Sequence, residues 1–110
     1  MNFYIGNSAN DIDVQDVNVE FSDELIDYIY KLSKQNSFDM SKLYEIDPYH
    51  DIEISKGDLP QIICICKYIL DMQLLEDYEE RDEGKEMLYN LLEIAQKALK
   101  KDLGLVSIGD

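Results

Sequence analysis

The chain has 110 residues, of which 45% are hydrophobic and 31% charged, a composition typical of one globular domain and not of a disordered chain. Its 24 acidic and 10 basic residues give a formal net charge of -14 at pH 7. Such a charge argues against direct binding to nucleic acid or to an anionic membrane and favours a basic partner, although an acidic surface that only keeps the protein in solution explains it equally well. The start of the chain lacks the basic and apolar regions of a secretory signal peptide, so we expect a single domain over residues 1–110, located in the cytoplasm.

The beginning of the chain predicts two short strands with an acidic loop between them. Residues 2–5 predict the first strand, and the alternation of apolar and polar side chains over residues 17–21 predicts the second. Residues 6–16 predict a polar loop, which carries the carboxylates of Asp11, Asp13 and Asp16. This loop superficially suggests calcium, but the glycine and the bidentate glutamate that an EF-hand requires are not at their positions.

A helix and a turn follow the second strand. Ser22 is a favourable N-cap for a helix over residues 23–35, whose first turn is acidic, as the helix dipole prefers. Residues 38–45 are ambiguous between a helical turn and an irregular edge. The Asp-Pro-Tyr segment at 47–49 predicts a turn, in which the aspartate bonds backbone amides and the tyrosine packs on the core.

We expect the domain to be built around residues 59–75. Their apolar side chains recur at helical spacing on two faces, which predicts a buried helix. The narrow polar stripe left between these faces consists of Gln61, Lys67 and Asp71. The segment is too short for a membrane span, which needs about 20 apolar residues. Asp58 is a candidate N-cap, and the alternating residues 51–55 before it predict a third strand.

The last third of the chain predicts an exposed connection, a long helix and a strand. Residues 76–83 carry seven charged side chains, of which one is basic, so we expect them to be exposed. Gly84 is expected to be a mild helix breaker, and the periodicity over 85–102 predicts an amphipathic helix. Gly104 is the candidate for the left-handed residue that ends it, and residues 105–108 predict a final strand.

These elements predict an α+β fold with a small, mostly antiparallel sheet packed on about three helices. The central helix over 59–75 is expected to lie between the sheet and the helices over 23–35 and 85–102. The order of the strands in the sheet does not follow from the sequence.

The sequence offers little that is typical of a catalytic or metal site. Cys64 and Cys66 cannot pair with each other on one helix and lie among isoleucines, so both are expected to be buried. His50 is the only histidine and is expected at the surface of a turn. No P-loop, dinucleotide-binding fingerprint, HExxH or GxSxG segment occurs. We therefore expect no enzyme, metal or cofactor, and keep a small hydrolase built on clustered carboxylates as the weakest alternative.

Two segments resemble a known class of protein. The segment LYEIDPYHD at 43–51, followed by a strand and an Ile-, Leu- and Cys-rich helix, resembles small acidic bacterial proteins encoded beside polymorphic toxins. The chain looks like an immunity protein of a contact-dependent growth inhibition system, and its final segment LVSIGD at 105–110 is similar to the ends of such proteins. This resemblance implies a cytoplasmic protein that binds and blocks one toxin domain, commonly a nuclease.

Acidic residues are the expected contact with such a partner. A nuclease must hold phosphates and is basic around its active site, so an acidic inhibitor can complement it. The densest acidic segment is the connection over 76–83, which offers Glu76, Asp77, Glu79, Glu80, Asp82 and Glu83. The competing site is the first loop, with Asp11, Asp13 and Asp16. A mimic of nucleic acid that inhibits many DNA- or RNA-binding proteins stays open as the alternative function.

Overall fold

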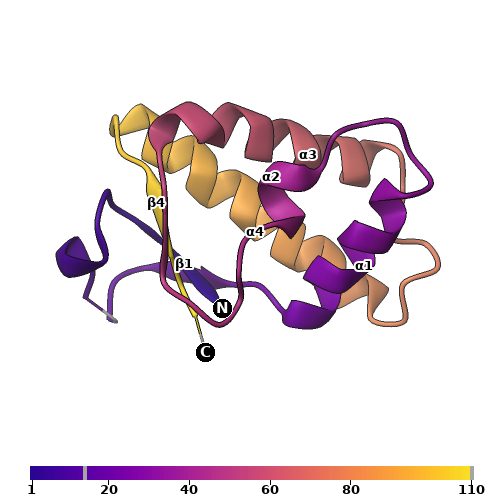
Figure 1. Cartoon of the computed structure of the whole chain (residues 1–110), viewed down its shortest axis with the longest axis horizontal. Helices are drawn as coiled ribbons and strands as arrows, with labels where there is room; N and C mark the ends of the chain where they lie inside the picture. The colour runs from indigo at the N-terminus through magenta and orange to yellow at the C-terminus, as the bar shows by residue number, and fades with distance from the viewer. Residues whose placement is uncertain (14, 110) are drawn as a thin grey trace.

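The computed structural model describes residues 1–13 and 15–109 and confirms the α+β fold, with an antiparallel sheet packed against helices (Figure 1). Val14 of the acidic loop and Asp110 of the final segment lie outside the described residues. The strands are β1 (Asn2–Ile5), β2 (Asn18–Glu20), β3 (Ile52–Ile54) and β4 (Leu105–Ile108). The helices are α1 (Asp23–Ser33), α2 (Ser41–Tyr44), α3 (Leu59–Asp71) and α4 (Arg81–Lys100), with the short 3-10 turns η1 (Ala9–Asp11) and η2 (Lys56–Asp58). Within the described ranges, no helix is both long and apolar enough to cross a membrane.

The four strands form one sheet in the order β2-β1-β4-β3, and every neighbouring pair is antiparallel. All four predicted strands are confirmed, although β2 and β3 are shorter than expected. Val17 does not extend β2, because the pairing of β1 with β2 stops at Tyr4, and Ile5 pairs with β4 alone. The side chain of Val17 is consequently left 81% exposed.

Both faces of the sheet are covered, one by a helix and the other by the loop that follows β1. Phe3 and Val19 are cross-strand partners on the face toward α4, and Phe3 is fully buried. On the opposite face, Val106 is also fully buried. The first loop is tied down there, since Gly6 N–H donates to Gly104 O at 3.0 Å and Ile12 lies against Gly6 beside Val106.

The helix that lies against the sheet is α4, which contacts β1 and β2, while α3 packs mainly against α4. The expectation that the helix over 59–75 would separate the sheet from the other helices is therefore wrong. The reason is that α4 is long enough to reach both the sheet and α3: its buried residues cover a broad stripe that includes Leu88, Leu91 and Ala95.

The helix α3 is buried on one side only, and this corrects the prediction for one of the two cysteines. Cys66 is fully buried, whereas Cys64 is exposed. Cys64 is three residues from both Gln61 and Lys67, so it lies on the same stripe of the helix as these polar residues. The apolar surroundings of Cys64 in the sequence belong to the other face.

The helix α3 ends at Asp71, four residues earlier than predicted, because the chain leaves the helix in a left-handed turn. Gln73 has a φ of 54°, and Leu74 N–H donates to Ile69 O at 3.0 Å, as in a helix C-cap. This turn returns Leu75 to the core, where it is 1% exposed. At the other end, Asp58 makes no side-chain capping bond, since η2 precedes the helix and the carboxylate of Asp58 pairs with Lys42 at 3.3 Å.

The helix α4 begins at Arg81 instead of 85, and Gly84 is a buried residue inside it. A side chain at Gly84 would meet the ring of Tyr78, whose nearest atom lies 3.0 Å from the position of the added Cβ. The glycine thus permits close packing and does not break the helix. At the other end, the left-handed residue is Asp102, with a φ of 59°, and not Gly104 as predicted.

The ambiguous segment over 38–45 contains the helical turn α2, and the turn after it has the expected backbone bonds. Asp47 Oδ1 accepts from Tyr49 N–H at 2.8 Å, and Asp47 Oδ2 lies 2.6 Å from Nδ1 of the exposed His50. The prediction for Tyr49 is wrong, because its side chain is 67% exposed. The backbone of this turn, and not the tyrosine ring, lies close to the rest of the molecule, at Gly109.

Candidate functional site

The connection between α3 and α4 is held in place by one partly buried aromatic residue. The ring of Tyr78 lies 4.8 Å from the ring of Tyr28 on α1, measured between centroids, and also packs over Gly84. Tyr78 N–H donates to Leu75 O at 3.0 Å. The charged residues around Tyr78 therefore stand on a fixed support.

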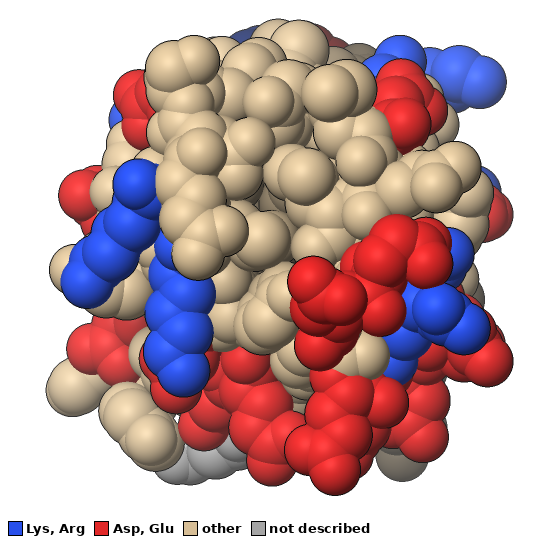
Figure 2. All heavy atoms as spheres, turned by 90° about the vertical axis from the view of Figure 1, so that its right-hand side faces the viewer, with Lys and Arg blue, Asp and Glu red and all other residues tan. Residues whose placement is uncertain are grey.

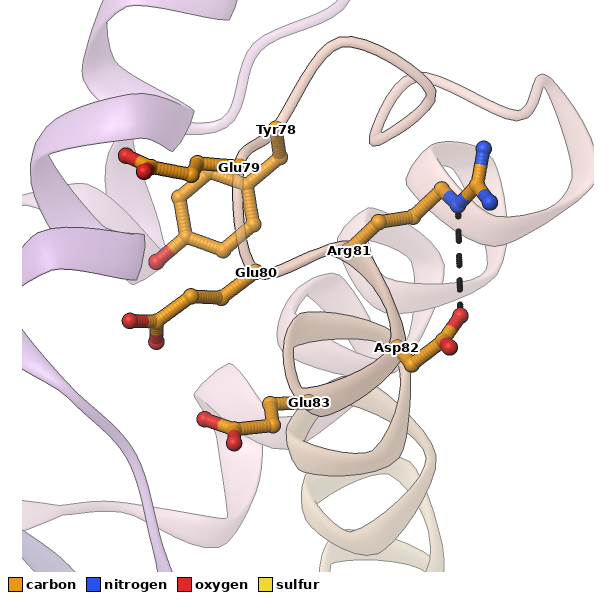
Figure 3. Close-up of a pocket in the computed structure, with 6 residues that line it drawn as sticks. All are labelled: Tyr78, Glu79, Glu80, Arg81, Asp82 and Glu83. Carbon is orange, nitrogen blue, oxygen red and sulfur yellow. Dashed lines mark ion pairs between the residues drawn. The ribbon is translucent and has the colours of Figure 1, made fainter.

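The acidic residues predicted at 76–83 divide into two groups that point in different directions. Figure 3 shows the side chains of Glu79, Glu80 and Glu83 on the side of Tyr78, and those of Arg81 and Asp82 on the other side. The three glutamates and Tyr78 border an open hollow of about 320 Å³, together with Arg81 and Asp82.

The negative charges of Glu76 and Asp82, outside the first group, are partly balanced by basic side chains. Glu76 accepts from Arg81 at 3.1 Å and from Lys85 at 3.4 Å, and Asp82 Oδ1 lies 3.9 Å from Arg81 Nε. Asp77 is exposed. Of the six predicted residues, Glu79, Glu80 and Glu83 therefore share one surface without an ion pair to any described residue, while Asp77, also without such a pair, acts electrostatically on Tyr28.

Other elements add carboxylates to this surface, which we call the acidic face. Glu24 belongs to the first turn of α1 and acts electrostatically on Glu80, while Glu20 of β2 and Glu86 of α4 border a neighbouring hollow of about 390 Å³ together with Glu83. Figure 2 shows acidic side chains gathered along the lower part of this side of the molecule. The acidic face consists of Glu20, Glu24, Glu79, Glu80, Glu83 and Glu86.

Three of these residues were missed by the sequence prediction. Glu86 shares a face with Glu83 because α4 begins at Arg81 and the two residues are three positions apart, but the predicted helix began at 85 and so did not include Glu83. Glu20 and Glu24 carried no usable signal, because β2 comes to this place by packing against α4 and α1 by the contact of Tyr28 with Tyr78.

The electrostatics of the acidic face are those of like charges held close together. The carboxylates of Glu83 and Glu24 raise the pKa of Glu80 above its ordinary value. Burial raises the pKa of Tyr78, and nearby glutamates add to this effect. A positively charged group bound here would relieve the repulsion and favour the ionised form of Glu80.

The competing site at Asp11, Asp13 and Asp16 is engaged in the structure of its own loop. Asp13 Oδ1 accepts from Gln15 N–H at 2.9 Å, and Asp16 Oδ2 accepts from Asp13 N–H at 3.1 Å. This loop and the α3–α4 connection lie at opposite ends of the molecule in Figure 1. The two predicted acidic sites are therefore separate surfaces.

In residues 1–13 and 15–109, no group of three or more His, Cys, Asp and Glu side chains is placed to hold a metal ion. Comparison of the chain with protein-family models, with curated proteins and with solved structures found no match. The chemistry of the acidic face itself, six carboxylates on a firm support, is complementary to Lys and Arg side chains.

Proposed function

We propose that the protein is an immunity protein, which binds one cognate toxin domain in the cytoplasm and neutralises it without catalysing a reaction. The observation that carries this proposal is the acidic face, where four separate parts of the chain contribute uncompensated carboxylates to one surface. The resemblance of the segments at 43–51 and 105–110 to immunity proteins of contact-dependent growth inhibition systems adds the kind of partner.

The partner that fits best is a basic nuclease domain. A nuclease active site gathers Lys and Arg to hold phosphates, so its field is opposite in sign to that of the acidic face. Attraction over long range speeds encounter, and complementary charges set the orientation in which the two proteins dock. The acidic face also supports an alternative, a mimic of nucleic acid, because clustered carboxylates can occupy a phosphate-binding groove.

The test is protection of cells from the toxin domain encoded in the neighbouring reading frame. We expect bacteria that express this domain to grow when the chain is co-expressed, and to die when it carries Glu79→Lys with Glu80→Lys. The matched control is Asp13→Lys with Asp16→Lys, which makes the same change of charge at the other end of the molecule and should leave protection intact.

A panel of unrelated nucleases separates the two functions. An immunity protein inhibits its cognate toxin alone, whereas a mimic of nucleic acid inhibits several members of the panel. Arrest of growth in spite of confirmed expression of the wild-type chain would contradict the immunity function.

A further inference from the structure

The strand β2 lies at the edge of the sheet with two residues whose backbone groups face outward. Phe21 N–H donates to Met1 O at 2.9 Å, and the Met1 amino group donates to Phe21 O at 3.1 Å, so this pair exchanges both of its bonds. Because such pairs alternate along an antiparallel ladder, Phe3 and Val19 form the next one. The N–H and C=O groups of Asn18 and Glu20 consequently point away from β1, toward the open side.

A groove runs along this open edge, between β2 and one stripe of α4. Its first part is the hollow bordered by Glu20, Glu83 and Glu86, and its second part is an apolar hollow of about 110 Å³. Asn90 borders both parts, so they are neighbours along α4. The apolar part is bordered by Ile5, Val17, Val19, Asn90, Glu93, Ile94 and Lys97.

An exposed valine, Val17, borders the apolar part of this groove. Val17 is 81% exposed, the largest exposed fraction among the large hydrophobic residues that lie on the surface. It stands directly before β2 and borders the apolar hollow with Val19 and Ile94. Covering this surface with another apolar side chain would stabilise a complex by about 25 cal/mol for each Å² removed from water.

We propose that an extended segment of a basic partner pairs with the open edge of β2 as an additional strand. Its backbone exchanges hydrogen bonds with Asn18 and Glu20, its apolar side chains fill the hollow at Val17 and Ile94, and its Lys or Arg side chains reach Glu83 and Glu86. This mode of recognition takes its affinity from main-chain bonds and its specificity from alternate side chains. The inference deepens the proposed function, since the toxin domain would supply the strand.

Charge decides which occupant fits this edge. A second copy of the chain would bring another net charge of -14 beside the acidic part of the groove, whereas a basic segment is attracted to it. The other edge of the sheet, β3, adjoins a hollow bordered by three acidic residues and Lys42, whereas the two hollows at β2 are bordered by four acidic residues and Lys97, so they carry one negative charge more. The edge at β2 is therefore the one suited to a basic strand.

The test uses a short blocked peptide of alternating Lys and Val residues and the isotope-labelled protein. On titration we expect the amide signals of Asn18, Glu20 and Val19 and the side-chain amide of Asn90 to shift together. The same peptide with alternate backbone amides methylated should bind roughly fivefold more weakly for each backbone bond lost, because a net hydrogen bond contributes about 1 kcal/mol. Absence of binding, or shifts confined to other elements, would overturn the proposal.

A matched pair of variants examines the backbone of β2 itself. Asn18→Pro removes the outward N–H without removing a backbone bond to β1. Asn18→Ala is matched to it, because both variants lose the side chain that accepts from Asn2 Nδ2 at 2.8 Å and Asn18→Ala keeps the N–H. We expect roughly fivefold weaker peptide binding for Asn18→Pro than for Asn18→Ala, and equal affinities would overturn the proposal. If Asn18→Pro does not fold, Val17→Asp replaces it and should abolish binding. Concentration-dependent shifts of the same signals without peptide would identify a second copy as the occupant and also overturn it.

These results separate this inference from the proposed function. Peptide binding at β2 without protection of cells from the toxin contradicts the immunity function alone. Protection that persists in Asn18→Pro, with no peptide binding to the wild-type protein, contradicts the added strand alone.

Discussion

The two thiols of α3 differ in exposure although they are separated by one residue. Burial raises the pKa of Cys66 to about 12, so its thiol stays protonated and shielded in the folded protein. Cys64 is exposed on the outer stripe of the helix. We expect a thiol reagent to label Cys64 quickly in the native protein and Cys66 only on unfolding.

The variant Cys64→Ser is the control for this labelling experiment. It should lose the fast phase and keep the slow one. Fast labelling of Cys64→Ser in its native state would mean that Cys66 is accessible and that α3 is packed less closely than described here.

The absence of a side chain at Gly104 permits the close approach of β3 and the segment before β4. A Cβ at this position would lie 2.2 Å from Ile54 O, a backbone atom that cannot turn aside. We expect Gly104→Ala to lower the free energy of unfolding by about 1–3 kcal/mol or more, as overpacking does. The measurement is denaturation with urea.

Gly57→Ala is the matched control for Gly104→Ala. The nearest atom to an added Cβ there is Ser55 Oγ at 3.7 Å, an ordinary contact. Its effect should stay within about 1 kcal/mol. Equal losses at both glycines would contradict the steric explanation.

At the scale of single residues, the sequence predicted what depends on near neighbours. Ser22 caps α1 by accepting from Leu25 N–H at 3.2 Å, as its type and position indicated. The constraint on Gly104 comes from Ile54, 50 positions earlier in the chain, and no local pattern reveals it.

Among the elements, α3 shows how far periodicity determines burial. Ile65 is fully buried, and its neighbour Cys64 is exposed. We expect Ile65→Asp to destabilise the protein by several kcal/mol, because it buries a carboxylate without a partner, while Cys64→Asp changes stability little. Thermal melting of both variants measures the difference, and similar melting temperatures would show that α3 has no buried face.

The ends of the elements were harder to predict than their existence. The start of α4 was placed too late because the charged residues 81–83 and Gly84 lack the apolar spacing that identifies a helix. Packing of Gly84 under Tyr78 stabilises that first turn, and this contact belongs to tertiary structure. In the same way, α3 ends early because Leu75 reaches the core only through a left-handed turn at Gln73.

At the scale of the whole molecule, only half of the residues that form the acidic face were predicted from the sequence. Glu79, Glu80 and Glu83 could be identified from the density of charge in one segment. Glu20 and Glu24 join them because β2 and α1 lie close to the start of α4. Glu76 is not part of the acidic face, since its carboxylate forms ion pairs with Arg81 and Lys85. The order of charged residues along the sequence does not reveal these ion pairs.

The pH dependence of association follows from the raised pKa of Glu80. A cationic partner lowers that pKa, so the complex holds fewer protons than the free protein, and affinity falls as the pH is lowered through the titration of Glu80. Over the same interval, protonation of Glu80 relieves repulsion in the folded state, so its contribution to stability changes in the opposite direction. We expect binding to the toxin domain to weaken before the protein unfolds, and Glu80→Gln to reduce this pH dependence.

Salt and charge reversal test the same attraction through the rate of association. Exposed charges are screened beyond about 10 Å at 0.1 M salt. Glu79→Lys with Glu80→Lys should slow association with the toxin domain about tenfold at low salt and flatten its salt dependence, while Asp13→Lys with Asp16→Lys should change neither. Rates and salt slopes that are equal for both double variants would show that the acidic face does not guide the partner.

The order of strands in the sheet has a consequence for how the chain folds. The central pair joins Asn2 to Ile108, so the ladder between β1 and β4 requires closure of nearly the whole described chain. Such closure is slow because the chain loses conformational entropy before any hydrogen bond of this ladder forms. The helices α3 and α4 are neighbours in sequence and can pack together early. In the described sheet, β3 pairs with β4 alone. A premature stop codon before Leu105 would therefore leave β3 without a pairing strand and would leave one edge of β1 open to other nascent chains. Even a small truncation would thus favour aggregation.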